Sequence, residues 1–344
     1  MKIAIVIDTW LPEVNGVVTT MHQIVEELKA AGHDPHVLST EGFLSIPCPG
    51  YTSIRLALFP QLKVNRILDE MQPDAIHIST EGPLGLAARR YCLKHRLNFT
   101  TCYHTKFPEY IRARAPIPLS VSYAWVRRFH NSASRVMVST PSLRAELEAR
   151  GFRNLVHWGK GVDTQLFRPR PKEHLEDKRP IFMYMGRVAV EKNIEAFLSL
   201  ELPGTQYVVG DGPDLEMLKR RYPAKFTGFL RGEPLAAMLA IADVFVFPSR
   251  TDTFGLVLLE AMAAGVPVAA FPVTGPKDVV IQGVTGFCDE NLRQAALACL
   301  ELDGDKCREY ALRYSWKNAA EEFLRNMVPA RRAPDKAEDA LASA

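Results

Sequence analysis

Residues 2–40, KIAIVIDTWLPEVNGVVTTMHQIVEELKAAGHDPHVLST, decide the fold class of this chain. A β-branched run from Ile3 to Ile7 is followed by a short loop and by a helical pattern from Val17 to Ala31. A second strand-like run, His36–Thr40, comes next. Strand, helix and strand joined by short loops indicate a parallel sheet of the α/β class.

The same alternation restarts near the middle of the chain. Residues 168–180, RPRPKEHLEDKRP, have the composition of a linker. Beyond them, Ile181–Met185 and Val244–Phe247 read as strands and Gly255–Ala264 as a helix. We therefore predict five segments: a doubly wound domain at 1–167, a linker at 168–180, a second doubly wound domain at 181–309, a helix at 310–328 that packs back towards the first domain, and a disordered tail at 329–344.

The composition describes a folded chain of ordinary charge. Of the 344 residues, 47% are hydrophobic and 24% are charged, which excludes a disordered or fibrous protein. The formal net charge of +3 is too small to indicate a nucleic-acid binder. The basic residues are nevertheless concentrated, because ten Lys or Arg and one acid, Glu109, lie between Arg89 and Arg135.

Cysteine usage and hydropathy predict a cytoplasmic location. The six cysteines are scattered and form no C-x-x-C pair, which is typical of a reduced compartment. The first residues lack the apolar region of a signal peptide, and no apolar run reaches the length of a membrane span. Peripheral contact with a membrane stays open.

The strongest motif is PSRTDTFGLVLLE, Pro248–Glu260, directly after a predicted strand. Asp252 lies in the loop and Glu260 inside the next helix, whose N-terminus can bind a phosphate. The two carboxylates can accept hydrogen bonds from sugar hydroxyl groups. A helix cap is the simpler interpretation of Asp252, but a carboxylate embedded in LVLLEAMAAG is costly to bury without a partner.

Four further loops follow predicted strands and so point to the same cleft. GRVAVEKN, Gly186–Asn193, supplies Arg187 and Lys192, two cations that suit a diphosphate, although they could be ordinary surface charges. The loop Asp8–Thr20 contains Gly16, whose amide can approach a phosphate closely, although a single glycine is a weak signal. His104 and Glu81 each follow a strand, and either could have a purely structural role.

A basic and aromatic segment, Cys102–His130, begins just before His104. Such a mixture suits an anionic membrane, with the aromatic rings at the interface and the cations towards the headgroups. A solvated basic helix with its aromatic side chains in the core is an equally good interpretation. The candidate acceptor or membrane contacts are Glu81, Lys106, Tyr110, Arg112, Arg114, Trp125, Arg127 and Arg128.

Three further stretches accompany these motifs along the chain: GKGVDTQLFRP at Gly159–Pro169, VGDGP at Val209–Pro213 and GVPVAA at 265–270. In combination they resemble glycosyltransferase family 4, whose members are retaining enzymes of the GT-B fold. The resemblance covers nearly the whole chain. It implies two Rossmann-like, doubly wound parallel-sheet domains that face a central cleft, with the acceptor bound by the first domain and the nucleotide-sugar donor by the second.

The resemblance assigns roles at the donor diphosphate and ribose. Arg187 and Lys192 would hold the diphosphate and stabilise the leaving group, with Gly16 adding a backbone amide. Glu260 would bind the ribose. The residues between Asp252 and that helix, Thr253, Phe254 and Gly255, would complete the donor site.

Other roles concern the transferred sugar. His104 would lie beside it, Asp252 would contact its hydroxyl groups, and Asp163 is a weaker candidate. The family usually has Glu where this chain has Asp252, so the sugar contact could shift by one methylene group. No D-x-D pair lies in a plausible metal-binding loop, so we expect neither a metal nor another cofactor.

The HTKFPEY stretch and the basic segment resemble the lipid-glycosylating branch of the family. That branch includes diacylglycerol glycosyltransferases, sulfolipid synthases and mannosyltransferases with lipid acceptors. We therefore expect a UDP-hexose donor, a diacylglycerol-like acceptor, an α-glycoside product, and a protein attached peripherally to the inner face of the cytoplasmic membrane.

Three alternatives stay open at this point. The first is a GDP-mannose-dependent α-mannosyltransferase with a soluble, polysaccharide or lipid-linked acceptor. The second is a sugar-nucleotide epimerase, and the third is a nucleotide-sugar binding protein without activity. Product analysis distinguishes the three, and the sequence leaves the oligomeric state open.

Overall fold

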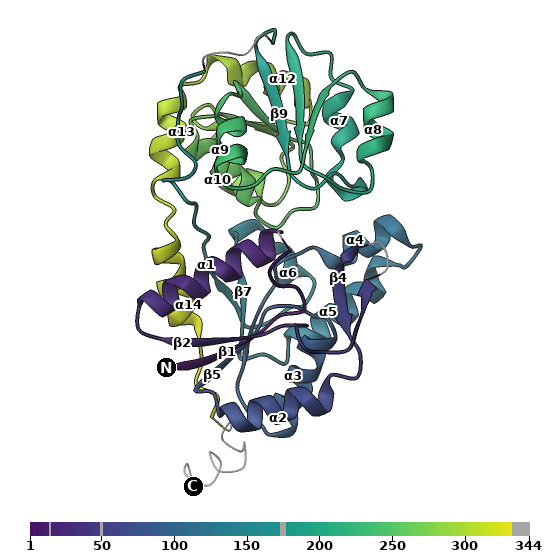
Figure 1. Ribbon diagram of the computed structural model, residues 1–344, viewed down its shortest axis with the longest axis vertical. Helices are drawn as coiled ribbons and strands as arrows, with labels where there is room; N and C mark the ends of the chain where they lie inside the picture. Colours follow the sequence, from purple (N-terminus) through teal and green to yellow (C-terminus); the bar gives the residue numbers. More distant parts are fainter. Residues whose placement is uncertain (14, 49–50, 173–176, 332–344) are drawn as a thin grey trace.

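A computed structural model describes residues 1–331 except 14, 49–50 and 173–176. Two α/β units lie one above the other (Figure 1), each built on a sheet of six parallel strands. The predicted pair of doubly wound parallel sheets is therefore confirmed. Parts of the predicted linker, 173–176, and of the predicted tail, 332–344, lie outside the described residues.

The first sheet has the strand order β2-β1-β5-β6-β7-β8. The order reverses between β1 and β5, and ligands of open parallel sheets bind beside such a reversal, at the carboxyl ends of the strands. A separate antiparallel hairpin, β3–β4, follows β2. The elements of this unit are β1 Lys2–Val6, α1 Gly16–Ala30, β2 Asp34–Leu38, β3 Ser45–Cys48, β4 Tyr51–Ala57, α2 Gln61–Met71, β5 Ala75–Ile78, α3 Pro83–Lys94, β6 Thr100–Cys102, α4 Phe107–Arg114, α5 Leu119–His130, β7 Arg135–Val138, α6 Pro141–Ala149 and β8 Leu155–His157.

The second sheet has the order β11-β10-β9-β12-β13-β14, so its reversal lies between β9 and β12. Its strands are fully buried in the centre, as expected for a parallel sheet covered on both faces. The elements are β9 Ile181–Met185, the 3-10 turn η1 Val190–Lys192, α7 Ile194–Leu198, β10 Thr205–Val209, α8 Leu215–Arg221, β11 Lys225–Gly228, α9 Gly232–Ala240, β12 Val244–Phe247, α10 Leu256–Ala263, β13 Val268–Ala270, α11 Pro276–Val279, β14 Gly286–Cys288, α12 Leu292–Ala298, η2 Cys299–Glu301 and α13 Gly304–Ala311.

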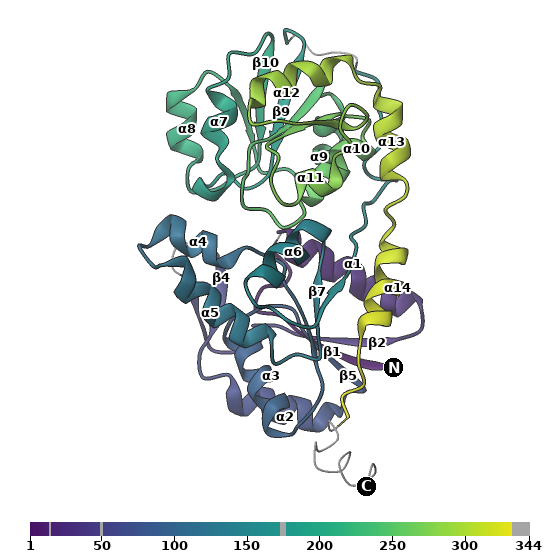
Figure 2. The same ribbon diagram turned by 180° about the vertical axis from the view of Figure 1, so that it is seen from behind.

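The last helix, α14 Trp316–Asn326, returns to the first unit and packs beside α1 (Figure 2). Ser315 caps it by accepting a hydrogen bond from the Asn318 amide at 3.1 Å. Its buried side chains recur at helical spacing and join the cluster around Trp158 and α1; they are Trp316, Ala319, Ala320 and Phe323. The chain therefore passes between the two units twice.

Glu322 fastens this helix to the carboxyl end of β8. Its carboxylate accepts hydrogen bonds from the His157 ring at 2.9 Å and from the Gly159 amide at 2.6 Å. We expect Glu322→Ala to lower the free energy of unfolding by about 1 to 2 kcal/mol, because a buried amide loses its acceptor. Urea unfolding measures this, with the exposed neighbour Glu321→Ala as the control. Equal stabilities of the two variants would contradict the anchoring role.

Candidate active site

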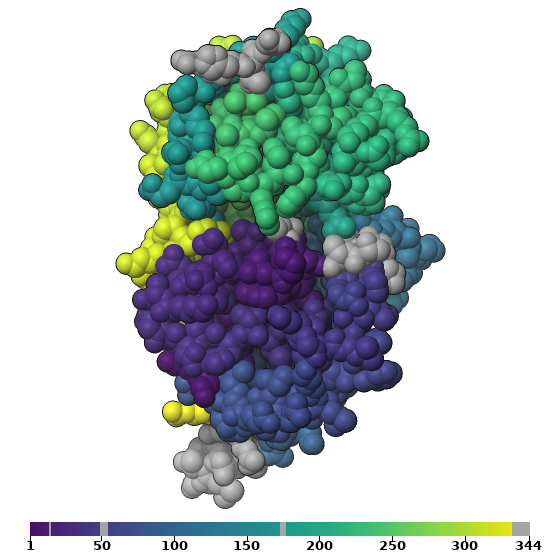
Figure 3. Space-filling model, viewed as in Figure 1, coloured from purple at the N-terminus to yellow at the C-terminus, as the bar shows by residue number. Residues whose placement is uncertain are grey.

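The site lies where the carboxyl ends of the two sheets face each other. The Thr253 hydroxyl, after β12, donates a hydrogen bond of 2.6 Å to the His104 carbonyl, after β6. The Ser139 hydroxyl, after β7, donates one of 3.2 Å to the Thr253 carbonyl. These bonds join the two units at the waist of the molecule (Figure 3). The strand-end loops that the sequence singled out therefore do converge.

Lys192 and Asp252 form the charged centre of this junction. Lys192 ends η1 after β9, Asp252 follows β12, and Lys192 Nζ lies 2.7 Å from Asp252 Oδ1. Burial lowers the pKa of Lys192, but Asp252, Tyr110 and Tyr184 together raise it well above its ordinary value. The amine is therefore a fixed cation. The second oxygen of Asp252 is buried and has no hydrogen-bond partner among the described residues.

The N-termini of α1 and α10 face each other across the junction. A Cβ atom placed on Gly16 would lie 3.8 Å from the Leu256 side chain, which begins α10. Asn15 caps α1 by accepting from the amides of Val17 and Val18. Helix α10 begins after Gly255, at φ 85°, and no side chain caps it. Two helix dipoles and the uncapped first amides of α10 thus point into the same space, which suits an anion.

Arg187 joins this region from the β9 loop. Burial raises the pKa of Glu13, a residue of the Asp8–Thr20 loop in the first unit, and the charge of Arg187 acts against that rise. The loop conformation is fixed in part by the Tyr184 hydroxyl, which donates to the Arg187 carbonyl at 2.8 Å. Arg187, Lys192 and the two helix ends therefore supply positive potential from both units.

Glu260 lies inside α10, and burial raises its pKa to about 7. No hydrogen bond or ion pair to its carboxylate is formed among the residues that the structure describes. A carboxylate in an apolar helix without a partner is unfavourable unless a ligand compensates it. Its position, one turn beyond the uncapped helix end, places it next to the anion site.

His104 is half-buried at the end of β6, with its ring against Trp158 at a centroid distance of 5.8 Å. Burial, reinforced by Lys160, His77 and His130, lowers its pKa well below the usual value. Its Nε2 atom is buried and has no partner among the described residues. An uncharged imidazole with a free nitrogen therefore borders the junction.

The expected acceptor or membrane contacts divide into two groups. Arg112, Trp125 and Arg128 are exposed, as that role requires. The other five are engaged within the protein: Glu81 pairs with His130 at 2.9 Å, Lys106 is buried against Glu146 at 2.7 Å, Tyr110 is half-buried beside Lys192, Arg114 pairs with Glu191 of the second unit at 2.6 Å, and Arg127 donates to the Arg150 carbonyl at 2.8 Å.

These five contacts correct the sequence-based interpretation. Lys106 has an exposed fraction of 7%, so its assignment to a membrane surface is wrong. Tyr110 belongs with the Lys192–Asp252 pair, because helix α4 carries it across the junction. Asp163 also differs from expectation: it is exposed and its side chain accepts from the Gln165 and Leu166 amides, so it shapes a turn.

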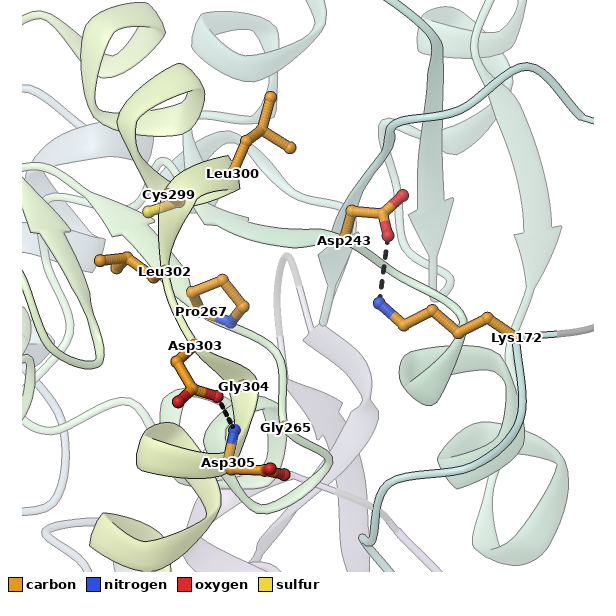
Figure 4. Close-up of a pocket in the computed structure, with 10 residues that line it drawn as sticks. All are labelled: Lys172, Asp243, Gly265, Pro267, Cys299, Leu300, Leu302, Asp303, Gly304 and Asp305. Carbon is orange, nitrogen blue, oxygen red and sulfur yellow. Dashed lines mark hydrogen bonds and ion pairs between the residues drawn. The ribbon is translucent and has the colours of Figure 1, made fainter.

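A cavity of about 380 Å³ lies away from this junction (Figure 4). It opens at the amino ends of β12 and β13, between Lys172, Pro267 and Asp303. Two of its three carboxylates already have partners, since Asp243 pairs with Lys172 at 3.1 Å and Asp303 caps α13. It is therefore not a candidate for the donor site.

Sequence reasoning missed one charged residue of the site. Lys160 follows β8 in the stretch GKGVD, has an exposed fraction of 7%, and lies close enough to His104 to depress the pKa of that residue. The available signal was a lysine between two glycines directly after a strand. No group of three or more His, Cys, Asp or Glu side chains in the described part of the chain is arranged to hold a metal ion.

Comparison with known proteins identifies the family. The model of Glycosyltransferase Family 4 matches residues 14–166, and that of Glycosyl transferases group 1 matches residues 167–300. A GDP-mannose-dependent alpha-mannosyltransferase of Corynebacterium glutamicum is 32% identical over 314 residues, which cover 83% of this chain and 76% of the relative. The chain belongs to glycosyltransferase family 4.

Other relatives of this family 4 enzyme have different donors and acceptors in their names. Sulfoquinovosyl transferase SQD2 of Arabidopsis thaliana is 33% identical over 343 residues, covering 90% of this chain and 66% of the relative. An alpha-monoglucosyldiacylglycerol synthase of Streptococcus pneumoniae is 26% identical, covering 78% of this chain and 71% of the relative. The enzyme is a hexosyltransferase by family, and its donor and acceptor differ among relatives.

Solved structures agree on the fold. Sucrose-phosphate synthase of Thermosynechococcus elongatus superposes with a TM-score of 0.73 at 21% identity, covering 99% of each chain. HepE of Anabaena, solved in complex with UDP, gives 0.68 at 16% identity, covering 94% of this chain and 99% of that one. The GT-B architecture expected from the sequence is confirmed.

Proposed function

We propose that this glycosyltransferase moves a hexosyl unit from UDP-hexose to a membrane lipid such as diacylglycerol and forms an α-glycoside with retention of configuration. The observation that carries the proposal is the half-buried Lys192–Asp252 pair beside the facing N-termini of α1 and α10. This arrangement suits a diphosphate next to a sugar. HepE, a protein of the same fold, was solved with UDP bound.

Each charged group has a place in the proposed transfer. The bond between the anomeric carbon and the diphosphate oxygen breaks, and its electron pair leaves with the nucleoside diphosphate. Arg187, Lys192 and the helix ends stabilise that negative charge, which is the preorganised electrostatic contribution typical of enzymes. The acceptor oxygen bonds to the same face of the sugar, and its proton passes to the leaving phosphate.

Two carboxylates and one histidine bind the neutral parts of the donor in this proposal. Glu260, whose carboxylate has no partner among the described residues, accepts hydrogen bonds from the ribose hydroxyl groups. Asp252 uses Oδ1 for Lys192 and keeps Oδ2 for a hydroxyl of the transferred sugar. Lys192 thus holds the Asp252 side chain, which is one methylene group shorter than the Glu usual at this position. His104 presents Nε2 to the same sugar.

The acceptor side rests on exposed apolar residues of the first unit. Phe107 and Trp125 of α4 and α5 contact each other at a ring distance of 6.4 Å and remain 40% and 41% exposed. Ile117 and Val121 of the same segment are also exposed, as are the cations Arg112 and Arg128 of the same two helices. Apolar side chains bordered by cations favour an anionic bilayer surface. Among the described residues no helix is both long and apolar enough to cross a bilayer.

The double variant Val121→Ser/Trp125→Ser tests this surface. We expect it to weaken binding to anionic vesicles at least about tenfold, because two apolar side chains no longer enter the interface. Vesicle flotation at low salt measures the binding. The matched control, Met217→Ser/Phe229→Ser, removes two exposed apolar side chains from the second unit. Equal flotation of both variants and the parent would contradict membrane docking through α4 and α5.

A GDP-mannose donor is the second candidate, because several relatives carry that donor in their names. Competition between UDP and GDP for the purified protein distinguishes the two. We expect UDP to bind more tightly; preferential binding of GDP would replace UDP-hexose by GDP-mannose and leave the transfer chemistry unchanged. Conversion of the free nucleotide sugar, or binding without turnover, would instead favour an epimerase or an inactive binding protein.

A further inference from the structure

Three buried nitrogen atoms without hydrogen-bond partners surround Trp158, directly behind the junction. Lys160 Nζ lies 3.5 Å from the Trp158 ring centroid. The rings of His104 and His77 meet the same indole at 5.8 and 6.4 Å, both edge-on. Lys160 Nζ and the Nε2 atoms of both histidines have no partner among the residues that the structure describes. The proposed function uses only one of these three groups.

The Lys160 side chain is a buried cation that bonds to no anion among the described residues. Its exposed fraction is 7%, and burial lowers its pKa to about 8, against the opposing effects of Cys102 and Glu322. Glu322 is the acid in reach, but its oxygens already accept from His157 and Gly159. Below pH 8 the ammonium is therefore charged and is stabilised mainly by the face of Trp158.

The position of this charge bears on His104. An ammonium beside an imidazole disfavours protonation of the ring, in the same direction as burial. His77 and His130 also oppose a charge on His104, and among the groups that influence the ring in this way Lys160 is the strongest. His77 itself is uncharged at neutral pH, because burial and Lys160 lower its pKa to about 3. Lys160 is thus a permanent positive neighbour of His104 below pH 8.

We propose that Lys160 is a positioning residue for glycosyl transfer: its buried charge on Trp158 keeps His104 uncharged, so that the free ring nitrogen accepts a hydrogen bond from a hydroxyl of the transferred sugar. The inference rests on the proposed function for the identity of that hydroxyl. Lys160 does not touch the donor in this account. It acts through the protonation state of His104, in the pH range where an ordinary histidine would gain a proton.

The test compares three variants by their pH profiles. Lys160→Met keeps the length of the side chain and removes the charge, Lys160→Arg keeps the charge, and Lys317→Met makes the same change on the exposed face of α14. For Lys160→Met we expect the acidic limb of the kcat profile to move up by about one pH unit, the size of a typical effect of a close like charge, with the KM for the donor unchanged. Lys160→Arg and Lys317→Met should follow the parent profile. Superimposable profiles of Lys160→Met and the parent would overturn the proposal.

A spectroscopic measurement on the parent protein keeps the inference testable if Lys160→Met does not fold or if transfer is not observed. The His104 ring resonances are assigned by comparison with His104→Gln and followed from pH 5 to 9. We expect no titration near pH 6.5 and a smaller displacement with a midpoint near 8, when Lys160 loses its proton. A His104 titration near 6.5, or no displacement near 8, would overturn the assignment independently of the proposed activity.

Discussion

Lys192→Ala is expected to lower the turnover of glycosyl transfer at least about a hundredfold, with a much smaller change in the KM for the acceptor. The lysine is a half-buried, permanently charged group whose position is fixed by Asp252 at 2.7 Å. Loss of one preorganised charge donor commonly costs about 100- to 1000-fold in turnover. Radioactive transfer assays under donor saturation measure the effect.

Lys172→Ala is the matched control for this prediction. Lys172 also pairs with an aspartate, Asp243, at 3.1 Å, but it lies at the opposite, amino end of the second sheet. We expect this variant to retain the parent turnover. Because the alanine at position 192 leaves Asp252 without its ion pair, the thermal midpoint is recorded for both variants. Near-normal turnover of folded Lys192→Ala would remove Lys192 from the mechanism.

Glu260→Gln is expected to weaken binding of the donor nucleotide about 10- to 100-fold while leaving the protein as stable as the parent or more stable. A hydrogen bond to a charged acceptor contributes about 1.5 to 3 kcal/mol, and the amide is a weaker acceptor. The expected stability of the variant follows from the parent protein, in which the Glu260 carboxylate is unfavourably buried without a partner among the described residues. The exposed Glu301→Gln of the same unit is the control, and titration calorimetry with UDP and GDP measures the affinity.

The pH dependence of this site has a definite sign. Burial raises the pKa of Glu260 to about 7, above its value of 4.5 in the unfolded chain, so the folded protein holds this proton more tightly. Ionisation of Glu260 therefore reduces stability as the pH rises from about 4.5 to 7. Donor affinity should change in the opposite direction and weaken as the pH falls through 7, and Glu260→Gln should abolish that dependence. An unchanged pH dependence in the variant would exclude Glu260 as its source.

The sequence predicted the sheets well because their strands are short apolar runs bounded by clear breaks. The predicted runs Ile181–Met185 and Val244–Phe247 are the observed β9 and β12. The hairpin β3–β4 was not predicted, because Pro47 interrupts its first strand and a register shift breaks its pairing. Helix α4 was not predicted, because Pro108 lies at its start and its charged residues leave no clear apolar periodicity in the sequence.

The site shows a similar division. The motifs named Arg187, Lys192, Asp252 and Glu260 as candidates, and each lies in a loop or helix that follows a strand of the second sheet, while their roles stay predictions. The partners of the basic segment were not predictable, because Arg114 meets Glu191 across 77 positions and Lys106 meets Glu146 across 40. Charge along the sequence indicated a membrane surface, whereas three of the five candidate cations, Lys106, Arg114 and Arg127, are engaged in tertiary contacts.

Transfer of a hexosyl unit to a membrane lipid is measured by incubating the purified protein with vesicles that contain diacylglycerol and anionic lipid. The donors are UDP-hexoses and GDP-mannose, each labelled in the sugar. The lipids are then extracted and separated. We expect the parent protein to place label from a UDP-hexose in a new α-linked glycolipid, and Lys192→Ala to place no label there. Absence of label from the lipid fraction with every donor, while the same donors label a soluble acceptor, would contradict this expectation.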